Sequence, residues 1–376
     1  MSLYRIVMRR KKCNLGLLII TFACFIYVTM VTMSLDIIRV TPRYQLTLAC
    51  DESTTNASQV LESSLASLKE KSINEIYDSF LNVGDPTYPI MLWNKYLLNN
   101  RDLCNMADNM SVLIVVKTDP LNFERRNIIR DTWSNYTHLG HMVVIRVLFL
   151  MGTVQNETIQ ENISNEFAEH LDILQGDFLD TYRNLTNKGV MGLRWITENC
   201  MQAKMIVEVD DDIVLDTYNL LQIVYPNYES KIRYILCNIF MDGKAPIVRD
   251  VKRKWFVNDS ELKSIGLLDK KIYPPYCSGF TVILATDLIP AMFGIAHVTQ
   301  FFWVDDVYIY GLLPLKAGRI DHYSLASNYT FSYQDAMKCF SSTSTCNILS
   351  VAETKPNEMR SVWNMIQSYH LKQQIP

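Results

Sequence analysis

Three consecutive aspartates, Asp210, Asp211 and Asp212, follow the apolar run 205–209. Adjacent carboxylates repel one another. A hard divalent cation such as Mn²⁺ or Mg²⁺ relieves this repulsion through oxygen ligands, which substrate phosphates usually complete. If strand alternation continued through the aspartates, Asp210 and Asp212 would point to one side and Asp211 to the other. The pattern predicts a metal site at Asp210 and Asp212. The alternative is a solvated acidic turn that caps the next helix at Asp216.

Asp305 and Asp306 form a second acidic pair, within the segment WVDDVY. Apolar neighbours raise the pKa of a carboxyl group, which suits it to act as a general base near neutral pH. The alternative is a helix N-cap, a position where aspartate is favoured. The sequence alone leaves both roles open for this pair.

Two arginines, Arg126 and Arg130, are four residues apart in the segment RRNIIRDTW. They share one face of a predicted helix, where their guanidinium groups could hold an anionic group such as a diphosphate. The alternative is that they pair on the surface with Glu124 or Asp131.

The segment YPPYCSG, residues 273–279, combines two prolines with a glycine. The prolines fix the backbone, and Gly279 allows it to approach a ligand closely. Tyr276 suits stacking against a sugar ring and suits packing in a core equally well.

Several other chemistries are excluded by motif. The sequence has no HExxH, no GxSxG, no GxxxxGK[ST] and no GxGxxG after a strand, and its six histidines show no zinc-like cluster. The net charge of −3 and the pI of about 6.1 give no sign of nucleic-acid binding.

The elements that must position these residues alternate along the chain from residue 111 onward. Short apolar runs predict strands at 112–116, 142–150 and 205–209. Helical spacing predicts helices at 122–133, 156–170, 181–200 and 358–371. The alternation indicates an α/β layered domain with a largely parallel sheet, in which ligands bind at the carboxyl ends of strands.

The N-terminus predicts a membrane anchor. Residues 15–33 carry no charge and are close to the roughly 20 residues that span a bilayer. The basic residues before them place residues 1–14 in the cytosol by the positive-inside rule. We therefore expect a transmembrane signal anchor at 15–35, and a cleaved signal peptide is the alternative.

Two features agree with a luminal body. Eight N-x-S/T sequons lie beyond the predicted span, at Asn56, Asn109, Asn135, Asn156, Asn162, Asn184, Asn258 and Asn328. Seven of the nine cysteines lie there too, so disulfides are expected, and Cys339 and Cys346 are close enough to close a small loop. An odd number leaves at least one thiol free or paired with another chain, and Cys50 could pair between chains.

Residues 36–108 are expected to form a luminal stem before a catalytic domain at 109–376. Apolar residues recur at helical spacing between 60 and 80. This helix could join two copies into a homodimer, or it could lie on the catalytic domain.

Six ordered blocks between residues 111 and 365 resemble the animal β-1,3-galactosyltransferase family, which is related to Fringe. They are RRNIIRDTW, VLFLMG, DILQGDFLDTYRNLTNKGVMGLRW, VEVDDDIVLD, YPPYCSG and WVDDVYIYG. The resemblance implies a GT-A fold, a Rossmann-like mixed sheet flanked by helices. It also implies a type II Golgi membrane protein with a luminal catalytic domain.

The implied activity is an inverting transfer of a hexose from a UDP-sugar to a hydroxyl of a glycan on a glycoprotein or glycolipid, forming a β-1,3 link. Galactose is the first expectation, and N-acetylglucosamine and N-acetylgalactosamine are alternatives. The resemblance assigns roles to the following residues: catalytic Asp306 and Asp305; donor-binding Arg126, Arg130, Asp180, Lys188, Asp210 and Asp211; a substrate loop with Tyr276, Ser278 and Gly279; and a Mn²⁺ or Mg²⁺ site at Asp210 and Asp212.

The chain departs from the family pattern at three places. Glu208 stands where the family usually has lysine and is expected to add negative charge beside the metal. Asp305 stands where the family has glutamate, and Phe280 begins a stretch where the family often has glycines. Because the metal acids and the base remain, an active enzyme is expected. A non-catalytic luminal member and a glycosidase with two carboxylates are the alternatives.

Overall fold

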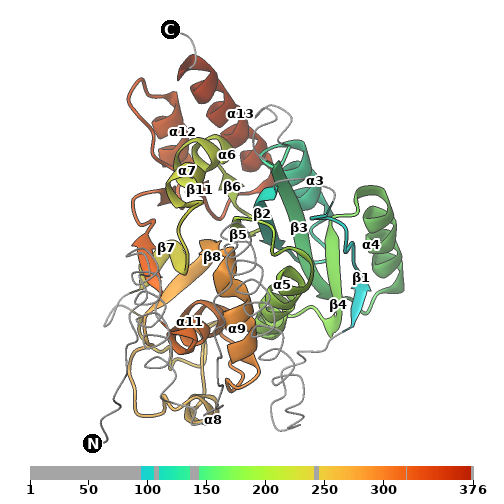
Figure 1. The fold of residues 1–376 in the computed structure, drawn as a ribbon, viewed down its shortest axis with the longest axis vertical. Helices are drawn as coiled ribbons and strands as arrows, with labels where there is room; N and C mark the ends of the chain where they lie inside the picture. The colour runs from blue at the N-terminus through green and yellow to red at the C-terminus, as the bar shows by residue number, and fades with distance from the viewer. Residues whose placement is uncertain (1–94, 106–109, 136–143, 241–244, 319, 374–376) are drawn as a thin grey trace, which may run out of the picture. The chain divides into compact units, whose positions relative to one another are not determined.

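The computed structural model describes residues 95–105, 110–135, 144–240, 245–318 and 320–373 (Figure 1). All of them belong to one compact unit within residues 71–376. The expected cytosolic tail, the anchor at 15–35, the helix at 60–80 and Cys50 lie outside the described residues. Among the helices that are described, none has both the length and the apolar character needed to cross a bilayer.

The described elements alternate between strands and helices through most of the chain. The strands are β1 (Tyr96–Leu98), β2 (Met110–Lys117), β3 (Val144–Thr153), β4 (Ile173–Leu179), β5 (Met205–Asp210), β6 (Val214–Leu215), β7 (Tyr234–Phe240), β8 (Tyr276–Ala285), β9 (Asp321–Ser324), β10 (Tyr329–Thr330) and β11 (Ser350–Val351). The helices are α3 (Phe123–Asp131), α4 (Glu157–His170), α5 (Leu185–Asn199), α6 (Thr217–Asn219), α7 (Tyr225–Tyr228), α8 (Asp259–Ser264), α9 (Ile289–Ala296), α10 (Asp305–Val307), α11 (Leu313–Ala317), α12 (Tyr333–Ser341) and α13 (Pro356–Gln373). Single π-helical turns continue α6 and α10 at Leu220–Val224 and Tyr308–Leu312.

The main sheet has eight strands in the order β1-β4-β3-β2-β5-β8-β7-β9. Strands β4, β3, β2 and β5 are parallel, whereas β8 runs antiparallel to both β5 and β7. The parallel half was predicted, and the antiparallel β8 makes the whole sheet mixed. A second, three-stranded sheet joins β10, β11 and β6.

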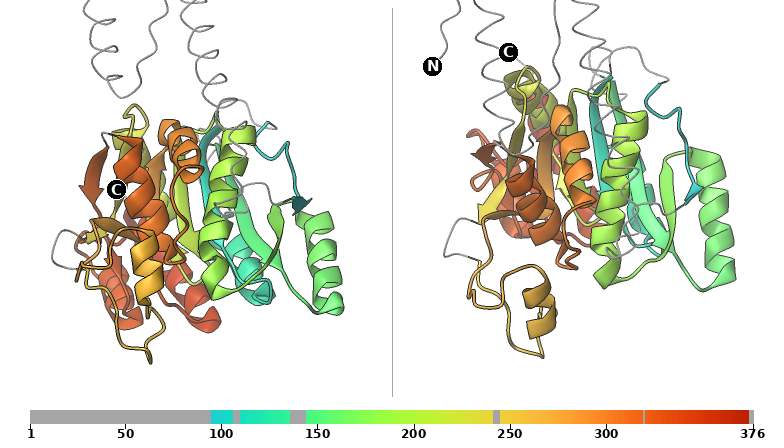
Figure 2. Two further views of the ribbon diagram at one scale, coloured as in Figure 1. Left: turned by 90° about the horizontal axis from the view of Figure 1, so that it is seen from below. Right: turned by 60° about the horizontal axis from the view of Figure 1, so that its bottom comes forward.

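Helices cover both faces of the main sheet, and each face has its own hydrophobic core (Figure 2). One core holds residues of α5 and α9, and the other holds residues of α3, α4 and α13. Strand β2 is buried along its whole length, and its side chains alternate between the two cores. This explains why its sequence is a continuous apolar run rather than an alternating one.

The strand order brings the chemically interesting segments to one edge. Because β2 and β5 are parallel, Lys117 and Asp210 are paired neighbours at their carboxyl ends. The antiparallel β8 begins at this same edge, since Thr281 pairs with Val209. The YPPYCSG segment therefore ends, at Gly279, beside the last residue of β5.

The folded region begins earlier than the predicted boundary at residue 108. Strand β1 pairs with β4, and Cys104 is fully buried and disulfide-bonded to Cys200 at the end of α5. Residues 95–105 are therefore part of the folded unit and not of a stem.

Two further disulfides join Cys237 to Cys277 and Cys339 to Cys346. The second of these is the small loop that the sequence indicated. The pairings of Cys104 and Cys237 were not readable from spacing, because their partners come from distant elements.

Six sequon asparagines lie within the described residues, and two of them begin helices. The side-chain oxygens of Asn156 and Asn258 accept backbone N–H bonds that cap α4 and α8. Both residues are exposed, and capping uses the oxygen, so the amide nitrogen that would carry a glycan remains available. Asn135 and Asn162 are also exposed, whereas Asn184 is half-buried and hydrogen-bonded to Leu179. A sixth, Asn328, is half-buried and donates to the carbonyl of Asn347, while Asn56 and Asn109 lie outside the described residues.

Candidate active site

A buried lysine joins the two acidic clusters. The Nζ atom of Lys117 lies 3.5 Å from an oxygen of Asp210 and 3.8 Å from an oxygen of Asp305. It also donates to the carbonyl of Gly279 over 3.3 Å. Segments separated by about two hundred residues of sequence are thus held together at one point by a single cation.

The charge of Lys117 is maintained by its carboxylate neighbours. Burial alone would lower the pKa of Lys117, but Asp210, Tyr310, Asp305 and Asp306 outweigh that effect and raise the pKa well above its ordinary value. Lys117 therefore remains protonated and partly neutralises a site rich in carboxylates.

Asp306 is the carboxyl group with the properties of a general base. Burial and the neighbouring charge of Asp305 raise the pKa of Asp306 to about 7, although Lys117 and the backbone N–H of Gly279 act in the opposite direction. Asp305 and Asp306 form the first turn of α10, but the N-cap is Val304 and no side chain caps the helix, so the alternative that an aspartate is the N-cap is wrong. A place in this first turn is compatible with the role of a base, because a helix N-terminus is a favourable place for a carboxylate.

Gly279 lies directly against the Asp306 carboxylate. A Cβ at this position would overlap an oxygen of Asp306 and would come within 3.1 Å of the Lys117 ammonium. Glycine is thus needed for close approach of β8 to α10. Tyr276 and Ser278 are half-buried on the same strand, and burial followed by the charge of Asp306 raises the pKa of Tyr276 to about 12.

Asp211 faces the loop between β2 and α3 rather than the other two aspartates of its run. Its carboxylate accepts hydrogen bonds from Thr118 Oγ1 at 2.6 Å and Asn122 Nδ2 at 2.8 Å, and it lies 3.3 Å from Arg125 Nη1. Strand β5 ends at Asp210, so the turn, not strand alternation, gives Asp211 its direction. Asp211 holds this loop in place, and its oxygens are already occupied by protein donors.

Asp210 and Asp212 fit the expected cation. Their side chains are 44% and 34% exposed, so both present oxygens to solvent. Burial raises the pKa of both groups; for Asp212 the next cause is the charge of Asp210, and its pKa rises to about 6. Within the described residues no three His, Cys, Asp or Glu side chains form a metal cluster. Two carboxylates that need substrate oxygens to complete the shell match Mg²⁺ or Mn²⁺ rather than a closed all-protein site.

Glu208 lies in the core and not among the exposed acids. It is 2% exposed and accepts a hydrogen bond from the Tyr310 hydroxyl. Burial raises the pKa of Glu208. The expectation that it adds negative charge on the metal side is therefore corrected, because its carboxylate is buried and accepts the hydrogen bond of the Tyr310 hydroxyl.

Arg126 and Arg130 do not face the acidic clusters. Arg126 is fully buried and binds Glu166 through Nε and Nη2 at 2.8 and 2.7 Å. Arg130 binds both Glu166 and Asp172 at 2.7 Å. The prediction that these two guanidinium groups hold a diphosphate is corrected, since their hydrogen bonds join α3 to α4 and to Asp172, the residue before β4.

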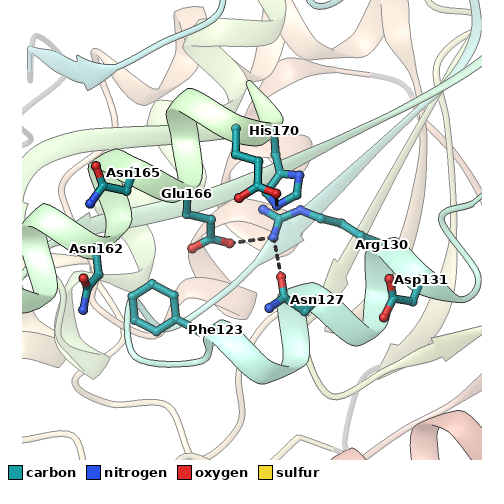
Figure 3. A pocket seen from close by; sticks show the side chains of 9 residues that line it. Phe123, Asn127, Arg130, Asp131, Asn162, Asn165, Glu166 and His170 are labelled. Atoms are coloured by element: carbon teal, nitrogen blue, oxygen red, sulfur yellow. Dashed lines mark hydrogen bonds and ion pairs between the residues drawn. The ribbon is translucent and has the colours of Figure 1, made fainter.

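These arginine pairs lie beside a surface groove of about 600 Å³ between α3 and α4 (Figure 3). Arg130 is directed into the groove and meets Glu166 and Asn127, while the sequon residue Asn162 lines its rim (Figure 3). The groove is lined by α3 and α4 alone, so it is separate from the carboxylates of β5 and α10.

Asp180 and Lys188 form a buried ion pair of 2.9 Å. Asp180 also accepts from the backbone N–H of Gly152, and Lys188 donates to the carbonyl of Thr118 at 2.7 Å. The predicted direct contact of Asp180 and Lys188 with the donor is corrected to a positioning role, because both side chains are buried and occupied.

Two residues near the acids were missed by the sequence analysis. Lys117 directly follows the apolar run of β2, so its place at the carboxyl end of a strand was a readable signal. Arg125 approaches Asp211 and Asp212 at 3.3 and 3.8 Å, yet helical spacing drew attention to Arg126 and Arg130 instead. Only the tertiary structure shows which arginine of the block meets the acids.

An aromatic wall adjoins Asp305. The rings of Tyr182 and Trp303 are 6.1 Å apart, and Arg183 lies 4.3 Å over Trp303. Burial followed by the charge of Asp305 raises the pKa of Tyr182 to about 12. Tyr182 is 37% exposed, so the wall presents an aromatic edge to solvent next to Asp305.

Several known proteins are similar to this chain in sequence. The galactosyltransferase family model matches residues 124–326, a stretch that contains both acidic clusters. The chain is 26% identical to β-1,3-galactosyltransferase 1 of Mus musculus over 287 residues, which is 74% of this chain and 80% of that protein. It is 27% identical to the human N-acetyllactosaminide β-1,3-N-acetylglucosaminyltransferase 2, over 80% of this chain and 74% of the relative.

The name of a third relative gives lactosylceramide as its acceptor. It is the Danio rerio lactosylceramide 1,3-N-acetyl-β-D-glucosaminyltransferase A, 30% identical over 59% of this chain and 58% of that protein.

Solved structures are more distant. A glycosyltransferase involved in glycosylation of the PBCV-1 major capsid has a TM-score of 0.36 at 11% identity, covering 68% of this chain and 99% of that one. The WbbM bifunctional glycosyltransferase has a TM-score of 0.35 over 72% of this chain and 53% of that one. At these values neither likeness adds to the argument. The family model covers more than half of the 376 residues, and on that basis this chain belongs to the galactosyltransferase family and is a glycosyltransferase.

Proposed function

We propose that the protein transfers a hexose from a UDP-sugar to a hydroxyl of a glycan acceptor, forming a β-1,3 link with inversion, on a GT-A fold. Galactose is the proposed sugar, and N-acetylglucosamine is the second candidate, because named relatives of similar identity use each. The observation that carries the proposal is the meeting of the two acidic clusters at Lys117, where the Asp210 side chain is 44% exposed and the Asp305 side chain is 14% exposed.

The exposed cluster serves the donor. Asp210 and Asp212 would hold Mn²⁺ or Mg²⁺, which when bound supplies positive charge for the diphosphate of the leaving UDP. Arg125, rather than Arg126, is the guanidinium group near these acids, so it is the residue placed to neutralise a phosphate oxygen.

The half-buried cluster, Asp305 and Asp306, serves the acceptor. Asp306 accepts the proton of the acceptor hydroxyl while the hydroxyl oxygen forms a bond to the anomeric carbon. The bond from that carbon to UDP breaks, and its electron pair leaves with UDP. Lys117 and the N–H of Gly279 fix the acids in place. A base on one side and a charge sink on the other are what a single inverting displacement needs.

We further propose that the protein is a type II Golgi membrane protein. The support is the uncharged segment at 15–33 behind a basic N-terminus, eight sequons and three disulfides, all of which suit a secretory compartment. Treatment of the full-length protein with an N-glycosidase tests this arrangement. We expect the enzyme to remove N-linked glycans and thereby lower the apparent mass of the protein. We also expect the protein to remain in the membrane fraction.

Isothermal titration with UDP tests the donor site. We expect UDP to bind in the presence of Mn²⁺ and to lose at least about tenfold in affinity without it, or in Asp212→Ala. Asp131→Ala, an exposed aspartate of α3 paired with Arg360, is the control and should bind UDP as wild type does. Absence of UDP binding under every condition would overturn the proposal in favour of a non-catalytic member.

A further inference from the structure

A lobe between β7 and β8 projects from the layered part of the molecule. It comprises residues 245–275 and includes α8, which lies at the end of the molecule opposite α12 and α13 (Figure 1). Two backbone hydrogen bonds join the segments that enter and leave the lobe. Ile247 N–H donates to the carbonyl of Lys271, and Tyr273 N–H donates to the carbonyl of Ala245. Figure 2 shows the lobe as a separate projection below the sheet.

The lobe carries a basic loop, residues 249–255, with the sequence RDVKRKW. It has four basic residues and one acidic residue, and every side chain in it is exposed. Its conformation is defined: Asp250 accepts from the Lys252 N–H, and Val257 N–H donates to Val248 across the neck of the loop. The basic loop therefore combines a defined backbone conformation with exposed positive side chains, although the net charge of the whole protein is −3.

Most of the positive charge of the basic loop is uncompensated. The ion pairs that the described residues form in this region are Arg249 with Asp259 and Arg183 with Glu261. Lys252, Arg253 and Lys254 have no carboxylate within 4.0 Å in this part of the chain. Three adjacent cations without counter-charges repel one another, so an anion would stabilise them.

The basic loop reaches the aromatic wall of the active site. Lys254 Nζ lies 4.0 Å over the ring of Tyr182, which in turn contacts Trp303 with ring centroids 6.1 Å apart. Trp303 precedes Asp305 by two residues. The loop is thus connected to the catalytic acids through two side-chain contacts.

The exposed groups at this connection match a charged saccharide. Trp255 is 46% exposed and Tyr182 is 37% exposed, and aromatic rings pack against the apolar faces of sugars. Lysine and arginine beside them form charge-assisted hydrogen bonds with carboxylate or sulfate oxygens. A neutral glycan would use the rings but would leave the three cations unpaired.

We propose that the basic loop binds an anionic group, a carboxylate or a sulfate ester, on the acceptor glycan whose hydroxyl is presented to Asp306. This inference rests on the proposed function and adds the chemical class of its acceptor. The anionic group lies on the acceptor and not on the donor, because the loop is joined to the Asp305 side of the site rather than to Asp212.

Matched acceptors test the inference on the full-length enzyme in detergent. The first pair is N-acetyllactosamine and the same disaccharide with a sulfate on C6 of its N-acetylglucosamine, assayed with UDP-galactose and UDP-N-acetylglucosamine. We expect the sulfated acceptor to have a KM about tenfold lower, and the preference to fade as NaCl is raised. A second pair, lactose and its analogue with glucuronic acid in place of glucose, distinguishes a carboxylate from a sulfate.

The variant Lys252→Gln/Arg253→Gln/Lys254→Gln should lose the preference while keeping the KM for the UDP-sugar and the melting temperature. The control Lys204→Gln/Lys338→Gln/Lys372→Gln removes three exposed lysines and should keep the preference. Lys204 lies just before β5, Lys338 lies in α12 and Lys372 lies in α13. Equal KM values for charged and neutral acceptors in wild type would overturn the inference and leave the transferase activity standing. Absence of both UDP binding and transfer would instead overturn the proposed function.

Discussion

Asp306 combines two properties that usually oppose each other. It is half-buried, and the loss of solvent favours the neutral acid, whereas nearby Lys117 favours the anion. Burial and Asp305 prevail, so the pKa of Asp306 rises to about 7. A base with a pKa near the working pH both exists as the anion and accepts a proton readily.

The pH profile of transfer reports this group. Because only the ionised carboxylate can accept the acceptor proton, kcat/KM should fall as pH drops below about 7 and level off above it. Asp306→Asn should lower kcat about 10³-fold above pH 7, with a smaller difference at lower pH, and leave Mn²⁺-dependent UDP binding intact. A profile of wild type without this inflection, or an active Asp306→Asn enzyme, would assign the base to another residue.

Gly279 controls the place of the base. In Gly279→Ala the added methyl group occupies the space of the Asp306 carboxylate, which must then turn away. Misplacing a catalytic group by about 1 Å can cost about 10²-fold, so kcat should fall by roughly this factor. The KM for the UDP-sugar should change little. Gly266→Ala is unsuitable as a control because Gly266 has φ +72°.

At the scale of elements, the pairing of α3 with α4 depends on buried charge. Glu166 accepts from both Arg126 and Arg130, and these bonds lower the pKa of Glu166 although burial acts to raise it. These two ion pairs with Glu166 explain why α3 carries two arginines four residues apart, although neither arginine faces the acidic clusters. They complete the contact of two helices over the same face of the sheet.

Removing one partner should therefore affect stability more than donor binding. Glu166→Ala leaves Arg126 buried without its carboxylate and should destabilise the fold by about 3–5 kcal/mol in urea unfolding. Arg360→Ala breaks an ion pair whose side chains are about half exposed and should cost less than about 1 kcal/mol. If Arg126→Lys folded normally but lost UDP affinity, the earlier assignment of Arg126 to the donor would be restored.

At the scale of the whole molecule, disulfides connect distant parts of the chain. Cys104–Cys200 closes 96 residues and ties the start of the folded unit to the end of α5, whereas Cys339–Cys346 closes 7. By loop-closure entropy the first should stabilise the fold by about 4–5 kcal/mol and the second by about 2–3 kcal/mol. Thermal unfolding of Cys104→Ala/Cys200→Ala and Cys339→Ala/Cys346→Ala should show the larger loss for the first pair. An equal or reversed order would mean that strain or residual denatured structure, not loop length, decides.

Much of the framework follows from the sequence by itself. The apolar runs that became β2 and β5 and the periodic segments that became α4 and α13 were predicted because burial imposes a local pattern on each element. The two acidic clusters were readable as well, since each lies next to an apolar segment. Their type and spacing already indicated a cation site and a base.

Tertiary structure decided which side chains meet. Lys117, Asp210 and Asp305 are brought together by the parallel pairing of β2 with β5 and by the approach of α10, contacts between residues far apart in sequence. The same long-range packing buried Arg126 against Glu166 and left Arg125 beside the acids. Helical spacing shows which residues share a face, but it does not show what that face packs against. The local sequence therefore determined which reactive side chains are present. Contacts between residues far apart in sequence determined how those side chains are arranged, and local periodicity does not reveal such contacts.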